Sequence, residues 1–186
     1  MPSSPCQIAL FIDGANLHAT AKALGFDIDY RRLLEEFERY GISCAPTTTP
    51  QSSKTENIAR STRWSWLDHN GYTVITKPAK EFVDASGRRK VKGDMDIELA
   101  VDAMELAEPI DQIVIFSGDG DFRSLVEAVQ RRGVRVTVVS TISTQPSIIA
   151  DELRRQADVF IDLAELQSRI GRDPAECAAP RPRIEH

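Results

Sequence analysis

Two short apolar runs, each followed by an acidic loop that contains glycine, constrain the fold of this chain more than any other feature. Residues 8–12 read Ile-Ala-Leu-Phe-Ile and stop at Asp13, and residues 113–116 read Ile-Val-Ile-Phe and stop shortly before Asp119. Continuous apolar runs of this length are typical of parallel strands that are buried on both faces. Because helical patterns follow both runs, we predict an α/β fold in which helices cover both faces of a mostly parallel sheet.

The periodicity of the remaining sequence extends this alternation along most of the chain. We expect further strands over 72–76, 134–139 and 159–161, and a hairpin over 82–91 whose turn is residues 84–87. We expect helices over 15–24, 29–40, 94–107, 121–132, 147–156 and 163–170. Residues 42–65 show no clear period.

The helix over 94–107 has the strongest helical pattern in the chain. We expect Ile97, Val101 and Met104 to form its core face, because they recur at helical spacing. Four acidic residues form a second stripe that we expect to be mostly solvated: Asp94, Glu98, Asp102 and Glu105.

The length and composition suit one compact domain with short extensions. Of the 186 residues, 41% are hydrophobic and 27% are charged, which is enough apolar surface for a packed core. We expect a short leader over 1–7, the domain over 8–170, and a disordered tail over 171–186, which is rich in proline and polar residues.

Three cysteines, at positions 6, 44 and 177, lie far apart and form no Cys-x-x-Cys pair. This distribution favours neither a disulfide framework nor a zinc site, and it suits a reducing compartment. The N-terminus lacks a basic segment, and its apolar run is too short for a signal peptide or a membrane span. We therefore expect a cytoplasmic protein without a membrane partner.

Acidic residues cluster at three points where chemistry is expected. Asp13 ends the first strand, Asp119 and Asp121 follow the strand over 113–116, and Asp96 lies in the first turn of the helix over 94–107. The carboxyl ends of parallel strands share one edge of a sheet, so these side chains can converge although the chain separates them. Helix capping is the simpler alternative for Asp13 and Asp121, and interaction with the helix dipole for Asp96.

Converging carboxylates are costly unless a cation lies between them. Oxygen ligands without a convincing histidine or cysteine favour Mg²⁺ or Mn²⁺. Such an ion can activate water for attack on the phosphorus of a phosphodiester. Asn16 can hold a neighbouring carboxylate or a water, and Asp102 could reach the site from further along its helix.

Basic residues lie between the strand over 72–76 and the second acidic motif. The net charge of the chain is -5, so binding to nucleic acid needs a local basic patch or metal ions. We interpret this segment as a clamp for an RNA backbone, with a solvated flap as the alternative. The basic residues are Lys77, Lys80, Arg88, Arg89, Lys90 and Lys92.

Taken together, the motifs resemble the NYN domain, in the LabA-like branch of the PIN-like ribonucleases. The matching stretches are ALFIDGANL, KPAKEF, KGDMDIELAVDAMELA, FSGDGDF and GVRVTVVS, and they cover roughly residues 8–41 and 66–166. The resemblance implies a Rossmann-like sheet, a divalent-metal site, and ribonuclease activity with single-stranded RNA as the expected partner. It also implies a set of catalytic carboxylates and two supporting polar groups. The carboxylates expected to bind the metal and to act in catalysis are Asp13, Asp96, Asp119 and Asp121, and the supporting groups are Asn16 and Ser117.

The sequence departs from the family pattern at two places. Position 94, commonly Asn, is Asp94 here, which adds a charge near the site. Residues 43–65 lack the aromatic-rich second strand Arg-Ala-Tyr-Tyr-Tyr-Thr-Ala and instead contain Ala-Pro-Thr-Thr-Thr-Pro. A one-base shift of the reading frame converts codons for the first sequence into codons for the second. Our hypothesis is a compensated frameshift whose frame is restored near Trp66, with a poorly formed central strand as its consequence.

Two other functions fit part of the pattern. A non-catalytic RNA-binding or regulatory module would keep the fold and the basic segment, but clustered carboxylates without a metal do not help to bind a polyanion. A phosphatase of the haloacid dehalogenase type is also considered, because Gly118 to Asp121 is similar to the last motif of that family. That family needs an Asp-x-Asp pair, and the residue two positions after Asp13 is Ala15. The oligomeric state stays open.

Overall fold

The protein is built around one parallel sheet of six strands. The computed structural model describes residues 7–39, 47–49, 73–74, 80–83, 89–92, 96–108 and 110–173. The strand order is β3-β2-β1-β6-β7-β8, and every neighbouring pair is parallel. The strands are β1 (Ile8–Asp13), β2 (Thr47–Thr49), β3 (Thr73–Val74), β6 (Gln112–Phe116), β7 (Arg135–Ser140) and β8 (Val159–Asp162). The predicted α/β fold with a mostly parallel sheet is confirmed.

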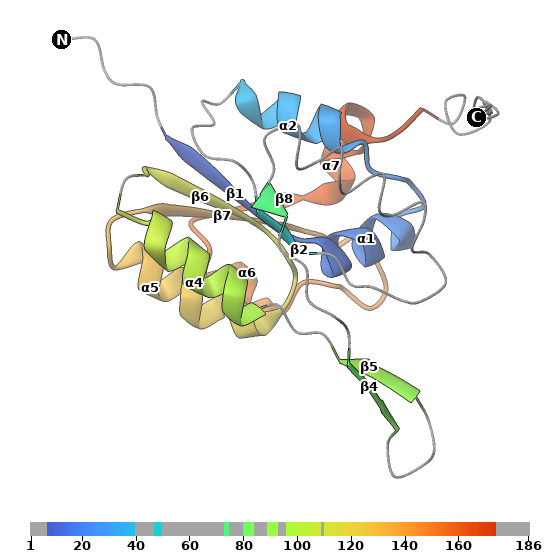
Figure 1. Cartoon of the computed structure of the whole chain (residues 1–186). Coiled ribbons are helices and arrows are strands. Elements are labelled where there is room, and N and C mark those ends of the chain that lie inside the picture. The colour runs from blue at the N-terminus through green and yellow to red at the C-terminus, as the bar shows by residue number, and fades with distance from the viewer. Residues whose placement is uncertain are drawn as a thin grey trace, which may run out of the picture.

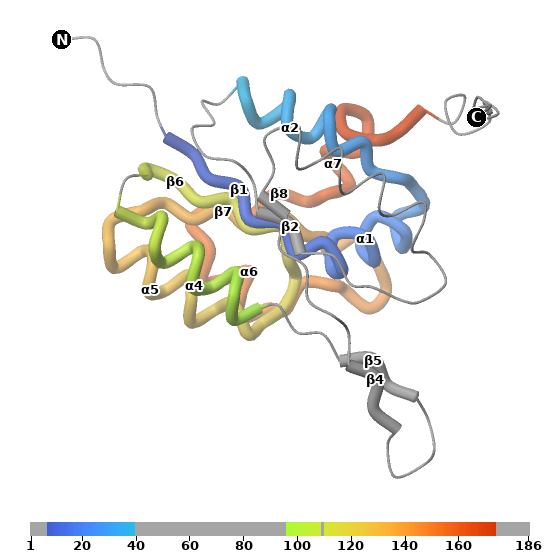
Figure 2. Tube along the Cα trace, viewed as in Figure 1, coloured from blue at the N-terminus to red at the C-terminus, as the bar shows by residue number. Residues whose placement is uncertain are grey.

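Helices lie on both faces of this sheet (Figures 1 and 2). The first face carries α1 (Gly14–Ala23), α2 (Tyr30–Glu38) and α7 (Leu163–Ile170). The second face carries α4 (Asp96–Leu106), α5 (Arg123–Gln130) and α6 (Asp151–Gln156). A short 3-10 turn, η1 (Gly120–Phe122), precedes α5.

Alternation along β1 divides the core into two layers. Leu10 and Ile12 pack with the first group of helices, whereas Ala9 and Phe11 pack with the second. Successive side chains of a strand point to opposite faces, so a strand covered on both sides needs an unbroken apolar run. This is the physical reason for the apolar composition of residues 8–12, all of which are buried.

Local signals in the sequence place several helix ends correctly. The Asp29 carboxylate accepts hydrogen bonds from the N–H groups of Arg31 at 2.9 Å and Arg32 at 3.3 Å, which caps α2 as predicted. Gly25 has a φ of 81°, the left-handed conformation that commonly ends a helix. The predicted bounds of α7 agree with the structure at both ends.

The helix predicted over 147–156 is too long. In the structure α6 begins at Asp151 because the preceding backbone is hydrogen-bonded elsewhere. The N–H of Ile149 donates to the carbonyl of Thr141 at 3.3 Å, and the N–H of Ala150 donates to the carbonyl of Gly118 at 2.9 Å. The first bond joins the segment to the residue after β7, and the second holds it against the loop that follows β6.

The predicted core face of α4 is wrong. Ile97 is 73% exposed and Val101 is 49% exposed, and the buried residues of this helix are Leu99 and Ala103. Met104 is only half-buried. Because α4 has apolar residues on two sides, periodicity alone does not select the side that meets the sheet.

The predicted hairpin is confirmed at its strands. β4 (Lys80–Val83) pairs antiparallel with β5 (Arg89–Lys92), and Lys80 lies opposite Lys92. The turn predicted over 84–87 lies outside the described residues. None of the helices in the described residues is both long and apolar enough to cross a membrane.

The strand order creates a switch point between β1 and β6. The chain proceeds from β1 outward to β2 and β3, and then returns to build β6, β7 and β8 on the other side of β1. Ligands of open α/β sheets bind at the carboxyl ends of the two strands that flank such a point. Asp13 ends one of these strands, and Ser117 follows the other.

Candidate metal centre

Asp13 and Ser117 lie side by side because β1 and β6 are neighbours. Ile12 is paired with Phe116, so the residues that follow them leave the sheet at the same edge. There the Ser117 hydroxyl donates to Asp13 Oδ2 at 3.1 Å. The N–H of Asn16 donates to Asp13 Oδ1 at 3.1 Å. Asp13 therefore caps α1 and also holds the start of the loop after β6.

Hydrogen bonds fix the shape of the loop after β6. Ser117 Oγ accepts from the N–H of Asp119 at 3.2 Å, and Asn16 Oδ1 accepts from the N–H of Gly118 at 3.0 Å. One oxygen of Asp119 accepts from the N–H of Asp121 at 3.0 Å, which opens η1. The two supporting residues from the sequence, Asn16 and Ser117, thus bond directly to this loop.

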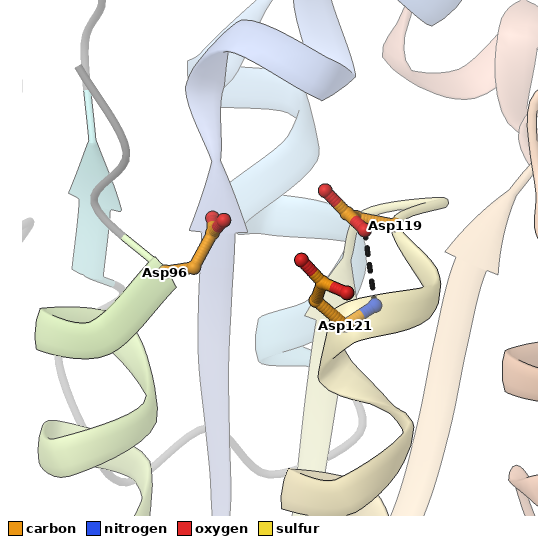
Figure 3. A group of neighbouring side chains, drawn as sticks. All are labelled: Asp96, Asp119 and Asp121. Atoms are coloured by element: carbon orange, nitrogen blue, oxygen red, sulfur yellow. Dashed lines mark hydrogen bonds between the residues drawn. The ribbon is translucent and has the colours of Figure 1, made fainter. Parts of the chain in front are cut away.

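Three carboxylates face one another in front of the loop (Figure 3). Asp96 is the first residue of α4, and Asp119 and Asp121 lie on either side of Gly120. One oxygen from each carboxylate lies within 4.8 Å of the other two. Asp96 and Asp119 are half-buried and Asp121 is exposed, so the cluster is open to solvent. Three like charges at this separation repel one another, and a cation between them would offset that repulsion.

Asp13 lies next to this cluster but is not one of its three members. Burial raises the pKa of Asp13 above its ordinary value, and the charge of Asp119 adds to this effect. The hydrogen bonds from Asn16, Ser117 and the N–H of Ala15 act in the opposite direction. The structure thus brings three of the four predicted carboxylates together, and the fourth, Asp13, is bonded to Ser117 of the loop that carries two of them.

Gly118 allows the loop to pass close to the segment after β7. A Cβ atom at this position would lie 2.7 Å from the carbonyl oxygen of Ile148 and 2.7 Å from the Ser140 hydroxyl. Real side chains do not approach that closely. The glycine of the sequence motif is therefore required by packing, because only glycine lets the loop approach Ile148 and Ser140 this closely.

The remaining predicted site residues lie elsewhere or outside the described residues. Asp102 is half-buried on α4, and its carboxylate does not belong to the three-carboxylate cluster. Its pKa is raised by burial and by the charges of Glu105 and Glu98. Asp94, Lys77 and Arg88 lie outside the described residues, and for four other basic positions only the backbone is described: Lys80, Arg89, Lys90 and Lys92.

The sequence analysis missed one acidic residue close to the cluster. A Cβ atom on Gly120 would lie 2.7 Å from Glu152 Oε1, so α6 brings a carboxylate against the loop between Asp119 and Asp121. The only signal in the sequence is the pair Asp151-Glu152 at the start of a short helix. Such a pair is ordinary at a helix start, because acidic groups there interact favourably with the helix dipole.

A protein-family model described as the NYN domain matches residues 7–165. The chain belongs to the NYN family. This NYN domain is 36% identical over 173 residues to the low amplitude and bright protein LabA of Synechococcus elongatus, an alignment that covers 91% of this chain and 90% of that protein. The predicted LabA-like NYN domain is therefore confirmed.

A solved structure supports the fold of the NYN domain. It is that of a Vibrio parahaemolyticus protein of unknown function, which is 26% identical and superposes with a TM-score of 0.72. The match covers 88% of this chain and 96% of that chain. The similarity therefore extends over nearly the whole domain.

Proposed function

We propose that this NYN domain is a divalent-metal-dependent ribonuclease that hydrolyses phosphodiester bonds of single-stranded RNA in the cytoplasm. The observation that carries the proposal is the meeting of Asp96 with Asp119 and Asp121 at the switch point of the sheet. Ribonuclease activity is what the NYN and PIN-like resemblance implies, and the three isolated cysteines suit a reducing compartment.

The three clustered carboxylates fit Mg²⁺ or Mn²⁺ by chemistry and by separation. They offer oxygen ligands only, which hard divalent ions prefer. Oxygens on opposite sides of Mg²⁺ lie about 4.2 Å apart, since each bond is about 2.1 Å long. The oxygens here lie within 4.8 Å of one another, so small side-chain rotations would bring them to that spacing. Bound there, the ion would activate water and neutralise charge on the scissile phosphate.

The chain's own residues orient the ligands. Ser117 links Asp13 to the backbone of Asp119, because its hydroxyl donates to one and accepts from the other. Asn16 holds the N–H of Gly118 and so fixes the intervening peptide. We propose Asp13 as a fourth catalytic carboxylate, and Asp94 and Asp102 as acidic residues that add negative potential near the cluster. Because the hydrogen bonds of Ser117 and Asn16 already fix the loop, less reorganisation is needed when a ligand binds.

Basic residues between β3 and α4 are proposed to contact the RNA backbone. They are Lys77, Lys80, Arg88, Arg89, Lys90 and Lys92. Contacts of this kind position a polyanion without reading its sequence. They also offset the net charge of -5, which opposes nucleic-acid binding elsewhere on the molecule.

The decisive experiment measures cleavage of a labelled single-stranded RNA during titration with Mg²⁺ and Mn²⁺. For Asp119→Asn we expect the rate to fall at least about a hundredfold, as is common when a key electrostatic group is removed. Asp27→Asn, a change at an exposed position after α1, is the matched control and should cleave normally.

Near-normal turnover by Asp119→Asn would remove Asp119 from the mechanism. Absence of cleavage by the wild-type chain, with RNA binding retained, would instead identify a non-catalytic RNA-binding module. Thermal unfolding of both variants verifies that each is folded before rates are compared.

A further inference from the structure

A buried hydroxyl group in α1 contacts one of the supporting residues of the metal centre. Thr20 is 1% exposed, and the other buried residues of this helix are Gly14, Leu17 and Ala21. Valine would fill the same space without a polar atom, whereas a buried threonine needs a hydrogen-bond partner for its hydroxyl. Both partners of the Thr20 hydroxyl are oxygens of Asn16.

The two contacts of the Thr20 hydroxyl differ in kind. It donates to the backbone carbonyl of Asn16 at 2.8 Å, and it also contacts the side-chain oxygen Oδ1 of Asn16 at 3.4 Å. A threonine within a helix commonly bonds the carbonyl four residues before it, so the first contact is ordinary. The second contact reaches a side chain that bonds to the loop after β6, and it is the one that bears on the site.

Asn16 Oδ1 is also the acceptor for that loop. The N–H of Gly118 donates to Asn16 Oδ1 at 3.0 Å. A carboxamide group can turn over and exchange its oxygen for its nitrogen, so its hydrogen bonds decide which atom faces which partner. Both donors here face Oδ1, and the Nδ2 group of Asn16 has no hydrogen-bond partner among the described residues. Thr20 and Gly118 together therefore set the sense of the Asn16 carboxamide.

The sense of this carboxamide affects the metal centre because Gly118 directly precedes one of the clustered carboxylates. The N–H of Gly118 is held by Asn16, and the N–H of the next residue, Asp119, is held by Ser117 Oγ at 3.2 Å. If the carboxamide turned over, its Nδ2 group would face the N–H of Gly118, and two donors would meet without an acceptor. The loop would then lose one of its two fixed points beside Asp119.

We infer that Thr20 is a positioning residue of the metal centre. Its hydroxyl fixes the Asn16 carboxamide, and Asn16 in turn holds the loop that carries Asp119. Thr20 is not a member of the three-carboxylate cluster and acts through Asn16. Its effect on metal binding rests on the proposed function, whereas its effect on the loop does not.

Two variants separate the hydroxyl from the rest of the side chain. Thr20→Val keeps the volume and removes the hydroxyl, and Thr20→Ser keeps the hydroxyl. With chelator present, the Gly118 amide of Thr20→Val should exchange its proton about three- to tenfold faster than in the wild type, the range that one neutral hydrogen bond supplies. Mn²⁺ affinity, measured by electron paramagnetic resonance, should fall by a similar factor. Thr20→Ser should match the wild type in both measurements.

Thr137→Val is the matched control. Thr137 is also 1% exposed, and its hydroxyl accepts from Gln112 Nε2 at 2.9 Å. Gln112 begins β6, at the end of the strand opposite to the metal centre. The control thus removes a buried, hydrogen-bonded hydroxyl away from the loop, and it should leave Gly118 exchange and Mn²⁺ affinity unchanged.

Three results would overturn the inference. The first is wild-type exchange of the Gly118 amide in Thr20→Val. The second is equally fast exchange in Thr20→Ser, which would assign the effect to the methyl group, or in Thr137→Val, which would assign it to general loosening. The third is unchanged Mn²⁺ affinity in Thr20→Val beside a wild type that binds Mn²⁺. A wild type that neither binds Mn²⁺ nor cleaves RNA would overturn the proposed function instead, and the Gly118 exchange rates would still decide whether Thr20 positions the loop.

Discussion

At the scale of single residues, the aspartates of the candidate site occupy different environments. Asp13 is hydrogen-bonded by Ser117 and by the N–H of Asn16, and its pKa is raised mainly by burial. Asp121 is exposed at the opening of the cluster. Asp13 is thus tied to the loop by hydrogen bonds, whereas the Asp121 carboxylate lies at the solvent side of the cluster.

Replacing Asp13 should stabilise the metal-free protein at neutral pH. Because burial raises the pKa of Asp13 above 3.8, ionisation costs more in the folded protein than in the unfolded chain. The associated stability is complete below pH 3.8 and is lost as pH rises through the folded pKa. Asp13→Asn removes this cost, so its unfolding temperature with chelator present should exceed that of the wild type at pH 7.

The gain from Asp13→Asn should shrink as the pH falls toward 3.8, which thermal unfolding across a pH series measures. An unfolding temperature below that of the wild type at pH 7 would show that the hydrogen bonds outweigh burial. The same variant should cleave RNA poorly if Asp13 is the fourth catalytic carboxylate.

Two glycines of one loop should differ in their tolerance of alanine. In Gly118→Ala the new Cβ meets the Ile148 backbone carbonyl at 2.7 Å, and we expect a loss of about 1–3 kcal/mol of stability. In Gly120→Ala the Cβ meets the end of the flexible Glu152 side chain at 2.7 Å, which can swing away, and the Ala150 Cβ at 3.2 Å, so we expect a smaller loss. Urea unfolding of both variants measures the difference, and equal losses would contradict the packing explanation.

At the scale of elements, ion pairs and hydrogen bonds of buried or partly buried charged residues hold neighbouring elements together. On the first face, Arg169 of α7 pairs with Glu36 of α2 at 2.6 Å, and Glu36 is 6% exposed. At the edge of the sheet, Asp162 accepts hydrogen bonds from Thr141 at 2.7 Å and from the Ser143 hydroxyl at 3.0 Å. These contacts order the segment after β7, which in turn packs on Gly118.

Removal of the α2–α7 ion pair should destabilise the fold measurably. Arg169→Ala leaves the Glu36 carboxylate buried with a weaker partner, and we expect a loss of about 1.5–3 kcal/mol. The matched control is Arg39→Ala, because Arg39 also pairs with Glu36 but at 3.5 Å and with 75% of its side chain exposed. That exposed pair should contribute less than about 1 kcal/mol. Denaturant unfolding measures the free energy of unfolding of both variants. A larger loss in Arg39→Ala would show that Arg39, and not Arg169, is the stronger partner of Glu36.

The strand β2 lies within residues 43–65, the segment that departs from the family pattern. In the structure Thr47–Thr49 form a strand that pairs with β1 and β3, so the position keeps its place in the sheet although prolines stand on both sides in the sequence. We propose that this segment arose by a compensated frameshift. The coding sequence read in the alternative frame should then encode the aromatic-rich strand, and gene sequencing that finds no such frame would reject the proposal.

At the scale of the whole molecule, topology and charge together define where ligands can bind. The strand order places the loops after β1 and β6 at one edge, where carboxylates of α4 and η1 also converge. A net charge of -5 restricts a polyanionic ligand to places where metal or basic side chains offset it.

Local rules predicted the strands other than β2, most helix ends and the acidic loops. A run buried on both faces must be apolar, Asp29 can cap α2 only at its start, and Asp119 follows β6 directly. The family resemblance then identified all three members of the carboxylate cluster. Local pattern did not reveal the start of α6, which long-range backbone hydrogen bonds set.

Packing decided which side of α4 meets the sheet, and it left Asp13 outside the three-carboxylate cluster. Leu99 and Ala103 are inside and Ile97 is outside because docking on the sheet selects one of two apolar sides. Asp96 joins Asp119 because α4 begins beside the loop that follows β6, whereas Asp13 is bonded to Ser117 and is not a member of the cluster. These choices depend on how distant elements pack, and spacing along the chain carries no information about that.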